Sequence, residues 1–170
     1  EEPIFFNNTG AVYVSRESAK ESPNVLAINL KNKKETQITQ HADPYPSIAN
    51  VQKSLISYKR KDGLTLSAQL YVPADFKNGD KPLPVLIWAY PREFKTKEAA
   101  GQVKGSEHRY PRLAFRSPVY WVTRGYAVLD QADMPIVGEG SSEPNDTFVQ
   151  QITDNASALI DYIVDVGVAD

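Results

Sequence analysis

Residues 84–90 read Pro-Val-Leu-Ile-Trp-Ala-Tyr, the longest apolar run in the chain. The run has the length of a strand and is far shorter than the roughly 20 residues that a membrane-spanning helix needs. A strand that is continuously apolar, rather than alternating, is typical of a parallel sheet that is buried on both faces. We therefore expect residues 84–90 to form such a strand in an α/β protein.

Two β-rich runs precede this strand and flank an Asp-Gly pair. Residues 54–60 (SLISYKR) and 64–72 (LTLSAQLYV) present an alternating face, and Asp62–Gly63 between them favours a tight turn. These runs therefore predict a β-hairpin. Residues 76–84 are rich in Gly, Pro and Lys, which predicts a loop between the hairpin and the apolar strand.

The residues after the apolar strand predict further alternation of helix and strand. Residues 91–117 are polar, which indicates a long loop with a short helix. Residues 119–124 (VYWVTR) predict a short helix closed by Gly125. Residues 126–131 (YAVLDQ) predict a strand, and residues 132–145 a second Gly/Pro-rich loop. This order after a hairpin favours an α/β sheet with a mixed first edge.

A long amphipathic helix is predicted for residues 147–166, with Asp146 as its N-cap and Gly167 as its end. Apolar residues recur there at steps of three and four, so they share one face of the helix. The apolar positions on this face are Phe148, Ile152, Ala156, Leu159, Ile160 and Ile163.

The first 57 residues have a different pattern, with short strands separated by polar turns. Residues 12–15, 25–30 and 37–39 are β-rich, and the charged turn before the last of them resembles the outer hairpin of a propeller blade. Only one such unit is present, so an isolated β-meander remains an alternative. Residues 41–50 contain two prolines and predict a linker.

Composition excludes several classes of function. The 170 residues include no cysteine and have a net charge of −2. Disulfides, thiolate metal sites and cysteine nucleophiles are therefore absent from this sequence. The charge gives no reason to expect nucleic acid or an anionic membrane as a partner. The sequence contains no metal-ligand cluster and no phosphate-binding motif, so we expect no cofactor. For the location of the protein, the periplasm or the outside of the cell is favoured over the cytoplasm.

No catalytic triad can be assembled from these residues. A nucleophile elbow needs Gly-x-Ser-x-Gly, and the nearest stretch, residues 138–142 (GEGSS), places no serine between the glycines in that way. The only histidines, His41 and His108, lie in predicted loops without a companion motif. Surface positions explain them better than a role as catalytic base.

Tyr90 is the remaining candidate. It ends the apolar run before Pro91, and ligands of open α/β sheets gather outside the carboxyl ends of strands. A phenol there could donate a hydrogen bond to an oxyanion. A core tyrosine whose hydroxyl reaches water is the alternative that the position alone leaves open.

Two long stretches resemble the glutamyl endopeptidase-like branch of the prolyl oligopeptidase family. They are residues 83–106 (LPVLIWAYPREFKTKEAAGQVKGS) and 117–151 (SPVYWVTRGYAVLDQADMPIVGEGSSEPNDTFVQQ). The resemblance implies a serine peptidase with a β-propeller followed by an α/β-hydrolase domain. Residues 1–57 would be the end of the propeller, and residues 58–170 the start of an incomplete hydrolase sheet.

The resemblance also implies roles for particular residues. Tyr90 matches the family's oxyanion-hole tyrosine, although Pro91-Arg92 stands where the family often has two glycines. Arg92 would bind substrate, and a preference for acidic residues could use it. The other arginines that occupy or follow the same loop are Arg109, Arg112 and Arg116, and for all four arginines solvated loop charges are the alternative. Glu139 lines the same end of the sheet and has no assigned role.

The family's nucleophile would lie in a strand beyond Asp170, so we expect an internal segment that is inactive by itself and acts on peptides within a longer protein. Two alternatives remain, a non-catalytic propeller or scaffold protein and an α/β-hydrolase esterase. We also expect the exposed sheet edge of such a segment to drive self-association.

Overall fold

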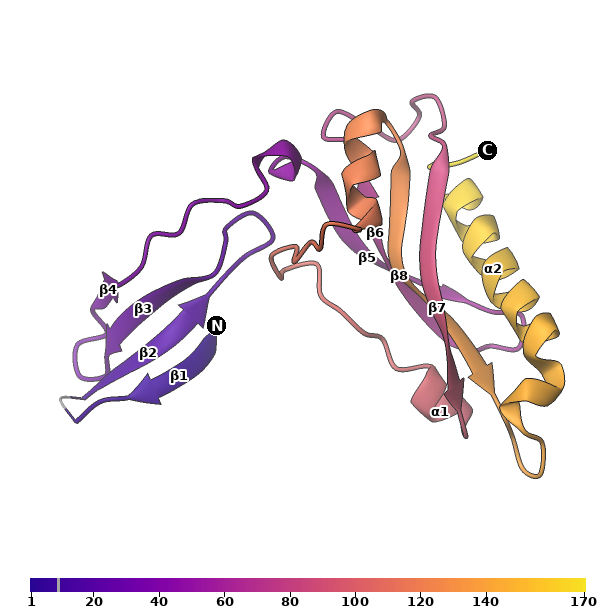
Figure 1. Ribbon diagram of the computed structural model, residues 1–170, viewed down its shortest axis with the longest axis horizontal. Coiled ribbons are helices and arrows are strands. Elements are labelled where there is room, and N and C mark those ends of the chain that lie inside the picture. The colour runs from indigo at the N-terminus through magenta and orange to yellow at the C-terminus, as the bar shows by residue number, and fades with distance from the viewer. Residues whose placement is uncertain (9) are drawn as a thin grey trace. The chain divides into compact units, whose positions relative to one another are not determined.

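The computed structural model describes residues 1–8 and 10–170. The chain divides into two compact units, shown in Figure 1. The first unit consists of Glu1–Asn50 and His108–Leu113, and the second consists of Val51–Glu107 and Ala114–Asp170. The domain boundary predicted after residue 57 lies within a strand of the second unit, and the domain types predicted for the two parts stay predictions.

The first unit contains a four-stranded antiparallel sheet of order β1-β2-β3-β4. The strands predicted at residues 12–15 and 25–30 are confirmed, the one predicted at residues 37–39 is found earlier, at Glu35–Gln37, and the first strand was not predicted. The small buried core of the first unit consists of Val12, Val14 and Leu26. The 3₁₀ helix η1 (Pro46–Ile48) lies in the predicted linker. The strands are β1 (Glu2–Phe6), β2 (Ala11–Arg16), β3 (Asn24–Asn29) and β4 (Glu35–Gln37).

Residues 108–113 belong to the first unit although they lie far along the chain. Arg112 pairs with Glu17 at 2.9 Å. The Tyr45 hydroxyl donates to the Leu113 carbonyl at 3.0 Å and accepts from the Leu113 amide at 3.2 Å. The long loop predicted for residues 91–117 therefore contributes its middle part to a different unit from its two ends.

The second unit contains a four-stranded mixed sheet of order β5-β6-β8-β7. Its first two pairs are antiparallel, and β7 and β8 are parallel. The predicted hairpin is confirmed, and its turn places Gly63 at φ +85°, a conformation that glycine adopts readily. The strands are β5 (Gln52–Lys59), β6 (Thr65–Val72), β7 (Val85–Phe94) and β8 (Ala127–Val137).

The prediction that residues 84–90 are buried on both faces is wrong. Strand β7 lies at the edge of the sheet and pairs only with β8 among the described strands. Trp88 is therefore 54% exposed and Tyr90 is 79% exposed. An apolar run reports how strongly a strand favours burial, but it does not report whether a neighbouring strand is present to cover it.

Strands β7 and β8 are both longer than predicted because each continues through a proline. Pro91 is tolerated in β7 because β7 is an edge strand, where the missing amide hydrogen of proline need not cost a ladder hydrogen bond. Pro135 is tolerated in β8 because β6 pairs with β8 only up to Asp130, which leaves one side of β8 free beyond that residue. The loops predicted after residues 90 and 131 are therefore partly strand.

The predicted helices are present with altered ends. The short helix before Gly125 is 3₁₀, and Gly125 closes it in the left-handed region at φ +82°. Asp146 is not the N-cap of the long helix, because it lies in η3 and accepts from the Glu143 amide. The helices are α1 (Lys97–Ala100), η2 (Pro118–Arg124), η3 (Pro144–Thr147) and α2 (Phe148–Asp165).

Helix α2 packs on one face of the sheet, and η2 lies against the other (Figure 1). Leu159 and Ile163 are buried in the core against β6 and β8, as predicted. Phe148 and Ile160 were predicted on the same face but are 38% and 47% exposed. Two polar residues, one turn and two turns before Leu159, occupy the core face instead.

These polar residues, Asn155 and Gln151, bind α2 to the backbone of β8. The Asn155 amide donates to the Pro135 carbonyl at 2.9 Å and accepts from the buried Arg60 guanidinium at 2.8 Å. Gln151 exchanges two 2.9 Å hydrogen bonds with the backbone of Val137. A buried polar group is stable only when it is hydrogen-bonded, and here both amides are.

Arg60 completes this network by pairing with Asp62 in the hairpin turn at 2.9 Å. The hydrogen bonds from Arg60 hold the pKa of the Asp62 carboxyl well below its usual range. A carboxylate with a lowered pKa stabilises the fold above its unfolded-state pKa and loses that contribution as the pH falls. The network therefore ties the β5–β6 turn, the end of β8 and α2 together at neutral pH.

The exposed edge of the second unit leads to a prediction about association. Strand β7 offers a free ladder edge with exposed Ile87 and Trp88, which favours pairing with another chain. We expect the apparent mass of the 170-residue chain in light scattering to rise with concentration. Ile87→Lys introduces a charge at this edge and should keep the chain monomeric. A constant monomeric mass for the unaltered chain would contradict this expectation.

Among the described residues, no helix combines the length and the apolar character required to cross a bilayer.

Candidate functional site

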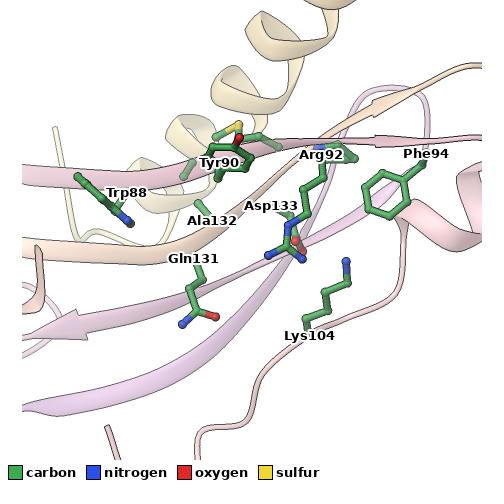
Figure 2. A pocket seen from close by; sticks show the side chains of 11 residues that line it. Trp88, Tyr90, Arg92, Phe94, Lys104, Gln131, Ala132 and Asp133 are labelled. Atoms are coloured by element: carbon green, nitrogen blue, oxygen red, sulfur yellow. The ribbon is translucent and has the colours of Figure 1, made fainter. Parts of the chain in front are cut away.

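The second unit contains a hollow of about 150 Å³ beside β7 and β8, shown in Figure 2. Strand β7 supplies Trp88, Tyr90 and Arg92 to its lining, and β8 supplies Gln131 and Asp133. Side chains two residues apart on a strand share a face, so β7 aligns its three side chains along one wall. With Phe94 and Lys104, which also line it, the hollow combines three aromatic side chains, two cations and a carboxylate.

An irregularity in β8 shapes this hollow. The pairing of β7 with β8 shifts between Ile87 and Ala89, and Gln131 opposite has a positive φ of 53°. A non-glycine residue in this region signals local strain, which is common near functional sites. The shift places Tyr90 beside Asp133 in the ladder.

Asp133 is held in place by β6. Its Oδ2 accepts from the Ser67 amide at 3.0 Å and from the Ser67 hydroxyl at 2.6 Å. These bonds replace the ladder between β6 and β8, which ends at Asp130. The sequence placed Asp133 in a loop and gave no signal for this role.

Tyr90 presents its ring to solvent rather than to the core. In the ranges 1–8 and 10–170, no hydrogen-bond partner of its hydroxyl is found, so the phenol is available to a ligand. It lies within β7 and not at the strand's end, because the strand continues to Phe94. The expected position at a carboxyl end is corrected, and the expected ligand-contacting role stays a prediction.

Arg92 and Lys104 supply the positive charge of the hollow. The Lys104 ammonium lies 4.9 Å from the centre of the Phe94 ring, a cation–π contact. Lys104 was missed by the sequence reasoning, because a lysine in a predicted polar loop carries no signal of its own. Alternation along β7 could have grouped Trp88 and Arg92 with Tyr90.

The other candidates from the sequence lie elsewhere. Arg109 pairs with Glu2 at 2.9 Å and Arg112 pairs with Glu17, all within the first unit. Arg116 lies over the Phe115 ring at 5.0 Å and does not line the hollow.

The two histidines and Glu139 do not join this hollow either. His41 and His108 belong to the first unit, where His41 lines a separate hollow. Glu139 follows the carboxyl end of β8, and its carboxylate lies 3.9 Å from the Lys97 ammonium. In the part of the chain that the structure describes, no group of three potential ligands is arranged to hold a metal ion.

Comparison with known proteins identifies the relationship. The family model described as X-Pro dipeptidyl-peptidase (S15 family) matches residues 62–165, which include every residue of the hollow. The chain belongs to this peptidase family. The match also includes β7, β8 and the whole of α2. The relationship to peptidases expected from the sequence is therefore confirmed.

Curated relatives agree with this peptidase relationship. The chain is 43% identical over 159 residues to a probable chloroplastic glutamyl endopeptidase of Oryza sativa subsp. japonica and 41% identical over 160 residues to one of Arabidopsis thaliana. These alignments cover 93% and 94% of the chain. The chain spans only 17% of either relative. The glutamyl endopeptidase-like resemblance is thereby confirmed.

A solved peptidase structure shares the fold. Porphyromonas gingivalis dipeptidyl peptidase 4 matches with a TM-score of 0.57 at 20% identity, over 99% of this chain and 23% of its own. At that identity the likeness concerns the fold alone. A peptidase structure thus contains a region of similar fold.

Proposed function

We propose that this chain is part of a serine-type peptidase that cleaves peptide bonds through an acyl-enzyme, with its residues contributing one wall of the active site. The match of residues 62–165 to a peptidase family carries this proposal. The short share of the relatives that the chain spans supports a longer protein as the active species. Its location in the periplasm or outside the cell remains a prediction.

In this proposal the two units are parts of larger domains. The antiparallel sheet of the first unit would be the end of a β-propeller, and the mixed sheet of the second would be the start of an α/β-hydrolase sheet. The antiparallel hairpin followed by a parallel pair supports the second assignment. Four short antiparallel strands agree with the first.

Tyr90 would donate its hydroxyl hydrogen to the oxyanion that forms on the scissile carbonyl. Its exposed phenol, without a partner in the described chain, supports this role. A donor that is already positioned stabilises developing charge more in the transition state than in the ground state. Tyr90 would therefore act on the chemical step rather than on substrate binding.

Arg92 would bind a substrate carboxylate near the reacting bond. It lies on the same wall as Tyr90, two residues along β7. Guanidinium and carboxylate form paired, charge-assisted hydrogen bonds. The word glutamyl in the names of the curated relatives agrees with a substrate that carries an acidic side chain.

The absence of Gly-x-Ser-x-Gly from these residues leads to a labelling prediction. An active-site fluorophosphonate reacts with an activated serine, and no serine here lies on a nucleophile elbow. We expect the purified 170-residue chain to remain unlabelled, while the longer protein is labelled at one serine outside it. Stoichiometric labelling of a serine within the 170 residues would contradict the proposal.

A further inference from the structure

Lys104 differs from the other lysines near the hollow. Lys95 pairs with Glu143 at 3.1 Å, and Lys97 pairs with Asp62 at 3.2 Å. Lys104 contacts the Phe94 ring, and no ion pair to a carboxylate is found for it in the described chain. Its charge is therefore available to a ligand in the hollow.

The backbone that directly follows this lysine is held against the sheet. Gly105 has φ +98°, a conformation that favours glycine, and a Cβ there would lie 2.8 Å from the amide nitrogen at the end of the Gln69 side chain. The Lys53 ammonium donates to the Ser106 carbonyl at 3.0 Å. Lys104 thus extends from an anchored segment rather than from a freely moving loop.

Arg92 faces the same space from the other side. In Figure 2 the Arg92 guanidinium and the Lys104 ammonium both point into the space between β7 and the segment that carries Lys104. Asp133 is the one carboxylate of the lining, and its Oδ2 is already bonded to Ser67. The lining therefore contains two cations and one carboxylate, which gives the hollow a net positive charge.

We propose that Lys104 and Arg92 form a two-cation clamp for one carboxylate of a peptide substrate, and that Lys104 sets the preference for an acidic over an uncharged side chain. This proposal rests on the peptidase function proposed above. Arg92 supplies planar paired donors, whereas Lys104 supplies a point charge on a side chain held by Phe94. An uncharged amide would leave the Lys104 ammonium without a countercharge, which weakens its binding.

The test compares two peptides that differ only in Glu or Gln at the residue preceding the cleaved bond, using the longer protein. Lys104→Met keeps the length of the side chain and removes its charge, so the Glu-to-Gln ratio of kcat/KM should fall about tenfold. Lys104→Arg should keep most of the ratio. Lys95→Met is the matched control, because that lysine lies outside the hollow and should leave the ratio unchanged.

A binding measurement separates failure of the clamp from failure of the peptidase function. Trp88 lines the hollow, so its fluorescence reports occupancy once Trp121→Phe removes the second tryptophan. N-acetyl-glutamate amide should bind this 170-residue chain more tightly than N-acetyl-glutamine amide, and Lys104→Met should reduce the difference, with Arg92 retaining the remainder.

The outcomes are distinct. If the longer protein cleaves no peptide but the fluorescence difference is present and depends on Lys104, the peptidase function fails and the carboxylate clamp stands. If peptides are cleaved and Lys104→Met changes neither the Glu-to-Gln ratio nor the fluorescence difference, the clamp is overturned and the peptidase function stands.

Discussion

Replacing Tyr90 by Phe in the longer protein should lower kcat by about 100-fold to 1000-fold and leave KM nearly unchanged, as expected for removal of one oxyanion donor. The substitution removes only the hydroxyl group. Because Tyr90 is largely exposed, its loss should not disturb the core. Steady-state kinetics on one peptide substrate measures the effect.

Tyr126→Phe is the matched control for this result. Tyr126 packs edge-on against Trp121, 5.4 Å between ring centres, and does not line the hollow. Its kcat should remain within a factor of about two of the unaltered protein, since no transition-state contact is removed. A Tyr90→Phe protein with unchanged kcat would rule out the oxyanion role.

Replacing Asn155 by Leu should lower the free energy of unfolding of the 170-residue chain by about 2–4 kcal/mol, because two buried polar groups lose a partner. Leucine has nearly the same shape as asparagine, so packing changes little. The Pro135 carbonyl loses its donor, and the buried Arg60 guanidinium loses an acceptor. Urea unfolding followed by circular dichroism measures the change.

Thr153→Ala provides the comparison on the same helix. Thr153 is exposed, and its hydroxyl donates to the Val149 carbonyl one turn earlier, so its replacement should change the free energy by less than about 0.5 kcal/mol. If Asn155→Leu were equally mild, the buried network would contribute specificity of packing rather than stability.

Local patterns predicted most elements of the fold. The Asp-Gly turn and its alternating flanks gave the β5–β6 hairpin, and the spacing of Leu159 and Ile163 gave α2. Pairing across the sheet could not be predicted in the same way. Whether Pro91 ends a strand depends on which of its edges has a neighbour, and this is decided by residues distant in the sequence.

The buried face of α2 shows a second limit. Periodicity of apolar residues placed Phe148 and Ile160 inward, but Gln151 and Asn155 are buried instead. A side-chain amide can be buried at a low cost in free energy only where a backbone or side-chain group forms a hydrogen bond with it. The Pro135 carbonyl is the partner of Asn155, and no local sequence pattern predicts this contact.

The candidate site was partly predictable for the same reason. Tyr90 and Arg92 lie on one strand, so a single run of sequence identified them. Asp133 and Lys104 reach the hollow through the shifted register of β8 and the close approach of Gly105 to Gln69. Such tertiary contacts cannot be predicted from the spacing of residues in the sequence.

The most direct test of a peptidase origin is hydrolysis by the longer protein of an internally quenched peptide containing a Glu bond, beside a simple ester of the same acyl group. We predict cleavage of the peptide, loss of that cleavage after fluorophosphonate treatment, and no activity of the 170-residue chain alone. Hydrolysis of the ester without any cleavage of the peptide would contradict the account and indicate an esterase.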